Sequence, residues 1–126
     1  MTLTELKAAV LQEIGALAPG ESPVIGDAQV VEDKYNALYE MLLTENLVTW
    51  TSTDDIPTFA EGPVIAMVAH LCAKPFGIPQ ARRVELEREG ALNLPPLKGG
   101  PSTAEKQLRR QLGRNFVYAS MKTCYY

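Results

Sequence analysis

Residues 63–73 read PVIAMVAHLCA, and this stretch decides the fold. It is apolar at nearly every position, so a helix formed by it has no polar side to turn toward water. A helix of that kind lies at the centre of its domain, because all of its faces need apolar neighbours. Pro75 ends it, since proline disfavours helical geometry in the residue before it, here Lys74. The stretch therefore predicts one central helix that other helices surround.

Ahead of this stretch, residues 3–17 have the pattern of a first amphipathic helix. Thr2 and Glu5 form a T-x-x-E capping box, which satisfies backbone N–H groups at a helix start. Apolar residues recur every three or four positions, at Leu3, Leu6, Val10, Ile14 and Leu17. The Ala-Pro-Gly sequence at residues 18–20 then predicts the end of this helix near residue 17.

Residues 27–45 predict a second, longer helix. Asp27 is placed to cap its start. One apolar stripe follows, widened by Tyr39 and Met41 and made of Ala28, Val31, Tyr35, Leu38 and Leu42. Asn46 tolerates the left-handed backbone of a C-terminal cap, and Leu47 after it can pack back on the last turn.

Residues 47–53 are β-branched and aromatic, which is typical of extended backbone or of one half of a short hairpin. No partner strand is evident nearby. Asp54 and Asp55 follow, and paired acids can serve as acid and base or hold a hard cation. Their position before Ile56 and Pro57 favours a turn into the central helix instead.

A short, highly charged helix is predicted over residues 81–89. Pro79 suits its first turn, and Gly90 suits its end. Residues 94–101 contain three prolines and two glycines, which exclude a regular helix and predict a linker.

A fifth helix is predicted after the linker, because Ser102 and Glu105 form a second capping box. Its apolar seam up to Gly113 consists of Leu108 and Leu112 only, which is too thin to anchor the helix firmly. Residues 115–126 carry aromatic side chains without a helical period. We interpret them as a tail that becomes ordered on a partner.

Length and composition fit one domain, because 126 residues at 46% hydrophobic content cannot fill two cores. No run approaches the roughly 20 apolar residues that span a bilayer, and the N-terminus lacks signal-peptide features. Cys72 and Cys124 give no disulfide framework, which favours a reducing compartment. We therefore expect a soluble all-α protein: a small bundle of four to five helices over residues 1–114, with an extended C-terminal tail over 115–126.

The net charge of −3 is unevenly distributed. Residues 1–81 carry three lysines against eleven acids, a charge of −8, whereas residues 82–126 carry nine lysines and arginines against four acids, a charge of +5. Such asymmetry suits head-to-tail association of copies or docking on an acidic surface, because complementary fields steer encounter. The alternative is that these charged residues lie on solvent-exposed helix faces and are clustered by chance.

The residue types needed for catalysis are scarce. One histidine and two isolated cysteines cannot make a zinc or iron site, and Gly99-Gly100 lacks the frame of a phosphate-binding loop. We interpret His70 as a hydrogen-bonded core or interface histidine and Cys72 as a small core residue. We therefore expect no catalytic role, no metal and no cofactor.

The candidate partner-binding residues lie near the C-terminus: Arg109, Arg110, Arg114, Phe116, Tyr118, Tyr125 and Tyr126. Arginine and tyrosine are enriched in interface hot spots, and an aromatic tail without its own core is exposed until a partner covers it. Nucleic-acid binding is the competing interpretation. A pI near 5.2 and the acidic first two-thirds weigh against it, because dedicated DNA binders are basic.

The order of these elements resembles a known family. Residues 6–23, then 27–42 with Trp50, and later 66–78, are similar to the head-to-tail adaptors of short-tailed bacteriophages, also called tail accessory factors, head completion proteins or packaged-DNA stabilisation proteins. The resemblance covers roughly residues 3–90 and rests on pattern. The chain is shorter after the fourth helix than we expect of some relatives.

The resemblance implies a virion structural protein of the head-tail junction, assembled in the host cytoplasm. Its partners would be further copies of itself in a ring of twelve, the portal protein above, and tail or nozzle proteins below. Such a ring closes the exit of the packaged DNA, and an acidic inner surface would let DNA pass without specific binding. We expect no contact with a membrane.

Two other classes of function stay open at this point. A small helical DNA-associated regulator would use the basic residues Arg82, Arg83, Arg109, Arg110 and Arg114. An enzyme would need a ligand site built around His70.

Overall fold

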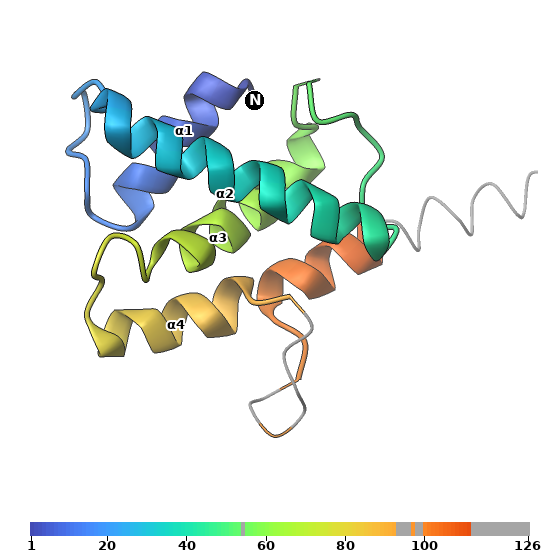
Figure 1. The fold of residues 1–126 in the computed structure, drawn as a ribbon. Coiled ribbons are helices and arrows are strands. Elements are labelled where there is room, and N and C mark those ends of the chain that lie inside the picture. Colours follow the sequence, from blue (N-terminus) through green and yellow to red (C-terminus); the bar gives the residue numbers. More distant parts are fainter. Residues whose placement is uncertain (54, 93–96, 98–99, 112–126) are drawn as a thin grey trace, which may run out of the picture.

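The chain folds as a bundle of helices, as predicted. The computed structural model describes residues 1–53, 55–92, 97 and 100–111, and in these ranges it contains helices and no strand. The first four helices are α1 (Leu3–Glu13), α2 (Ile25–Thr44), α3 (Thr58–Cys72) and α4 (Gln80–Gly90). A fifth covers 103–111, where the description ends (Figure 1). The expected tail over 115–126 lies outside the described residues.

Helix α3 occupies the centre, which confirms the prediction from residues 63–73. It packs against α1, α2 and α4, and Figure 1 shows it between α2 and α4. Its buried residues follow no single face: Ala60, Pro63, Val64, Met67, Val68, Ala69 and Cys72. The apolar composition thus decides the architecture, because every side of α3 meets another part of the core.

Helices α3 and α4 come into close contact at Gly90. A β-carbon added to this glycine would lie 2.6 Å from the carbonyl carbon of Ala66 and 2.9 Å from the backbone nitrogen of Met67. Real β-carbons do not come so near to backbone atoms, so only a glycine allows this crossing. Gly90 therefore sets the distance between the two helices, in addition to ending α4.

Two helix boundaries differ from the prediction. Helix α1 ends at Glu13 and not near residue 17, because Gly15 adopts a left-handed φ of 78° and the N–H of Ala16 donates to the carbonyl of Leu11 at 2.8 Å. Helix α2 begins at Ile25, so Val24 and not Asp27 holds the cap position. Asp27 lies in the first turn, where its charge still favours the helix dipole.

The end of α2 confirms the predicted cap. Asn46 has a φ of 57°, and the N–H of Leu47 donates to the carbonyl of Leu42 at 2.8 Å. This hydrogen bond turns the chain back, and the side chain of Leu47 is buried on the last turn.

Residues 47–53 form no hairpin, contrary to one of the two expectations. Tyr35 and Tyr39, one turn apart on α2, hold Trp50 in place. The indole Nε1–H donates to the Tyr35 hydroxyl at 3.1 Å, and the Tyr39 hydroxyl donates to the Trp50 carbonyl at 2.6 Å. Phe59 of α3 meets the indole edge to face, with ring centroids 6.4 Å apart. The aromatic content of this stretch thus serves packing between α2 and α3 instead of strand pairing.

Candidate interaction surface

The helix 103–111 carries the described part of the predicted partner-binding segment. The N–H of Glu105 donates to the Ser102 hydroxyl at 3.2 Å, which is one of the two hydrogen bonds of the predicted capping box. Ala104 and Leu108 enter the same core cluster as α1, α2 and α3. Burial of a leucine contributes about 1.5–3 kcal/mol, so this thin seam still seats the helix on the body of the protein.

Arg109 is the residue that joins this helix to α2. Its Nη2 lies 3.4 Å from a carboxylate oxygen of Glu45, just past the end of α2, and 3.4 Å from one of Glu105. The side chain of Glu105 is almost fully buried, and a buried carboxylate needs such a partner. The exposed pair with Glu45 contributes only about 0–1 kcal/mol. Arg109 therefore fixes the orientation of the helix but contributes little free energy to its attachment.

The remaining residues of the predicted site divide into two groups. Arg110 is exposed, and within the described ranges it forms no ion pair. Arg114, Phe116, Tyr118, Tyr125 and Tyr126 lie outside the described residues. The structure thus brings together Arg109 and Arg110 on one short helix.

The two oppositely charged parts of the sequence meet within one molecule. Arg82 of α4 lies 3.0 Å from a carboxylate oxygen of Glu13 and also donates to the Glu13 backbone carbonyl at 3.3 Å. Its hydrogen bond to Glu85, and then that to Glu13, raises the pKa of Arg82. The pair of Arg109 and Glu45 makes a second link of the same kind. The complementarity expected between copies is therefore partly used inside the chain.

Sequence reasoning missed exposed apolar side chains at the two opposite ends of α2. Val24 and Ile25 are 67% and 89% exposed at its start, and we call them the leading patch. Leu43 is 49% exposed near its end, and we call it the trailing patch; Met41, 41% exposed, lies on the other side of the buried Leu42. The expectation that Met41 widens the buried stripe was wrong, because Leu38 and Leu42 face the core and Met41 lies beside that face. A helix of 20 residues separates the patches by about 30 Å.

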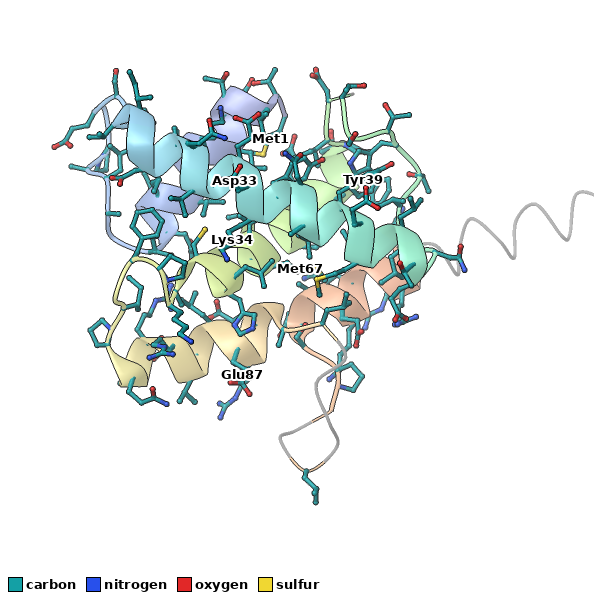
Figure 2. All side chains as sticks on the ribbon, in the orientation of Figure 1. Met1, Asp33, Lys34, Tyr39, Met67 and Glu87 are labelled. Carbon is teal, nitrogen blue, oxygen red and sulfur yellow. The ribbon has the colours of Figure 1, made fainter. Side chains whose placement is uncertain are left out.

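A hollow of about 260 Å³ lies between the end of α3 and α4. Its lining mixes basic, acidic and apolar side chains: His70, Leu71, Ala73, Lys74, Gln80, Arg83, Val84 and Glu87. Figure 2 shows Glu87 on α4 and Met67 at the centre of the bundle. Burial lowers the pKa of His70, and the nearby carboxylate of Glu87 opposes this effect. His70, which we interpreted from the sequence as a core or interface histidine, is thus half-buried at the edge of the core.

A larger hollow of about 440 Å³ lies between the first turn of α1, the middle of α2 and the turn before α3. Exposed Asp55 lines it, together with Glu32, which forms an ion pair with Lys7 at 3.2 Å. Asp54, the other acid of the pair seen in the sequence, lies outside the described residues. The rest of its lining is mostly polar or aromatic: Leu3, Tyr35, Asn36, Ser52, Thr53 and Ile56.

Chemically reactive groups are scarce in the described part of the chain. Nowhere in it do three His, Cys, Asp or Glu side chains gather closely enough to hold a metal ion. Cys72 is buried, and burial raises its pKa to about 11.

Every described helix is too short or too polar to traverse a lipid bilayer. Comparison with protein-family models, with curated proteins and with solved structures finds no match.

Proposed function

We propose that this chain is a virion structural protein, a head-to-tail adaptor of a short-tailed bacteriophage. Twelve copies form a ring at the head-tail junction, beneath the portal protein. The ring closes the exit of the packaged DNA and provides the attachment site for tail or nozzle proteins. DNA passes through the ring without specific binding, and the protein has no catalytic role.

The observation that carries this proposal is the position of the leading and trailing patches at opposite ends of α2. A closed ring of identical copies needs two different surfaces on each copy, since every interface joins one surface to the other. Burial of these exposed apolar side chains in such contacts is favourable, because it removes apolar area from water. The two patches supply a pair of surfaces about 30 Å apart.

The positions of the helices add a second line of support. Residues 6–23 and 27–42, on which the resemblance to the adaptors rests, fall on α1 with its closing turn and on α2. Residues 66–78 cover the second half of α3 and the turn before α4. The patterns that suggested the family are therefore patterns of real helices and turns.

Electron microscopy of the protein mixed with purified portal rings of a phage that carries it tests the proposal. We expect a second, twelvefold ring stacked on the portal. Ile25→Ser and Leu43→Ser each remove one patch and should abolish the second ring. Val84→Ser is the matched control, because Val84 is also exposed but lies on α4, outside both patches. Absence of a second ring with the unchanged protein would refute the adaptor role.

The C-terminal tail is tested separately. Deletion of residues 115–126 should abolish association with portal while the far-UV circular dichroism spectrum keeps its helical shape. Portal binding that survives this deletion would contradict the assignment of Phe116, Tyr118, Tyr125 and Tyr126 as partner-binding residues.

Ion pairs within the chain weigh against the DNA-associated regulator. Of the arginines that such a protein would use, Arg82 is paired with Glu13 and Glu85, and Arg109 with Glu45 and Glu105. Phosphate binding would have to compete with these carboxylates. A salt-dependent shift of duplex DNA by the purified protein would nevertheless favour that alternative over the adaptor.

A further inference from the structure

The contact between helix 103–111 and the body of the protein is complementary in shape and in charge. Ala104 and Leu108 occupy an apolar site in the core cluster, which also contains side chains of α1, α2, α3 and α4. Arg109 meets Glu45 just past the end of α2, across 64 positions of sequence. We call this site on the body the helix seat. In the structure the chain's own helix 103–111 occupies this site.

The connection between this helix and α4 is long. Residues 91–102 join the two, and Pro95, Pro96, Gly99, Gly100 and Pro101 in this segment do not favour a helix. Twelve residues can span up to roughly 40 Å when extended, several times the width of a helix. A helix on such a tether can reach a seat on a neighbouring molecule as well as its own.

We propose that the helix seat is an interface between copies of this chain, in which helix 103–111 of one copy occupies the seat of another. Every contact of the exchanged arrangement is one that the structure already contains, so the exchange needs no new complementary surface. The tether provides a high effective concentration for the chain's own seat, so the exchange requires a high concentration of chains.

Charge favours a second copy over a different partner. The helix carries Lys106, Arg109 and Arg110 against one acid, Glu105, and it meets Glu45 of the segment 1–81, whose net charge is −8. The same opposition of charge brings any two copies together in this orientation. The inference concerns the chain alone and does not require that it be a phage adaptor.

Cross-linking of two single-cysteine chains tests the exchange. Both carry Cys124→Ser, and Cys72 is buried. One has Glu45→Cys and the other Arg109→Cys, so a short bis-maleimide can join them only when the helix of one copy lies on the seat of the other. The two chains are unfolded together in urea, refolded at high concentration and then cross-linked. We expect a covalent heterodimer whose yield rises with protein concentration.

Two controls make the result specific. Arg109→Cys mixed with Glu21→Cys should give no heterodimer, because Glu21 is exposed before α2, at the end far from Glu45. Leu108→Asp added to the Arg109→Cys chain should abolish the heterodimer, since it removes the apolar contact with the seat. A heterodimer that persists with Leu108→Asp would overturn the proposal.

A chain with both Glu45→Cys and Arg109→Cys completes the test. If it cross-links only within itself, and the two single-cysteine chains give no heterodimer at any concentration, the exchange is refuted. The outcome is independent of the adaptor role: a chain that forms rings on portal but no heterodimer would refute the exchange alone.

Discussion

Replacing Gly90 by alanine is the most direct test of how α3 and α4 are held together. The added β-carbon would overlap the backbone of Ala66 and Met67. Backbone atoms in the middle of α3 cannot rotate away as a side chain can, so α4 must move outward. Overpacking of this kind typically costs about 1–3 kcal/mol. Alanine's better helix propensity, worth up to about 1 kcal/mol inside a helix, offsets little at the last residue of α4.

We therefore expect Gly90→Ala to lower the free energy of unfolding by about 2 kcal/mol, a large part of the roughly 5–15 kcal/mol of a small domain. Urea unfolding followed by far-UV circular dichroism measures it, and with a slope of about 1–3 kcal/mol per molar the midpoint should fall by about 1 M. Gly26→Ala in α2 is the matched control, because no atom lies within 4 Å of its added β-carbon. It should leave the stability unchanged or raise it by up to about 1 kcal/mol. A Gly90→Ala protein as stable as the control would refute the close approach of the two helices.

Three further predictions follow from buried groups. Tyr35→Phe leaves the Trp50 indole N–H without its hydrogen-bond acceptor and should cost about 1–3 kcal/mol in urea unfolding, whereas equal stability would mean that another acceptor replaces the hydroxyl. In a Cys124→Ser chain, Cys72 should resist a thiol reagent at neutral pH until urea unfolds the protein. The reason is that its thiol is buried and its pKa is raised to about 11. Fast labelling of the folded chain would show that the site opens locally. Burial lowers the pKa of His70, so the unfolded chain binds a proton at this residue more readily than the folded chain does. The free energy of unfolding should therefore decrease as the pH falls below about 6.5, the ordinary pKa of histidine, and His70 should have no such effect at higher pH. His70→Gln should lose less stability between pH 7.5 and 5.5 than the unchanged protein, and an equal or greater loss would contradict this sign.

The elements that could be predicted from the sequence are those set by local patterns. The apolar run around Met67 predicted the central helix, and Asn46 with Leu47 predicted the end of α2. Thr2 and Ser102 cap their helices as predicted, because their hydroxyls accept from the N–H groups of Glu5 and Glu105. These features depend on neighbours within a few positions, which a sequence displays directly.

The boundaries that were wrong depend on competition between signals. Ile14 and Leu17 continue the apolar spacing of α1 and are buried, yet the backbone leaves the helix at Gly15. Burial shows which side chains face the core, but it does not show whether the backbone between them is still helical. Met41 is a different case: the backbone there is helical, and its side chain lies beside the face that Leu38 and Leu42 turn to the core.

The candidate interaction surface could be predicted only in part. Arg109 and Arg110 were singled out for their type, but the sequence did not reveal that Glu45, far away along the chain, meets Arg109. The leading patch, with Ile25, was missed because apolar residues at the start of a helix look alike in the sequence whether they are covered or not. Such relations arise from tertiary packing, which periodicity does not encode.

The setting of Trp50 gives the protein a built-in optical reporter. It is the only tryptophan in the sequence; Tyr35 and Phe59 hold its ring between α2 and α3, and Tyr39 holds its backbone carbonyl. Its fluorescence emission therefore depends on the packing of these two helices. A binding partner that leaves the emission spectrum unchanged has met a rigid body, whereas one that shifts it to longer wavelength has loosened the junction of α2 and α3.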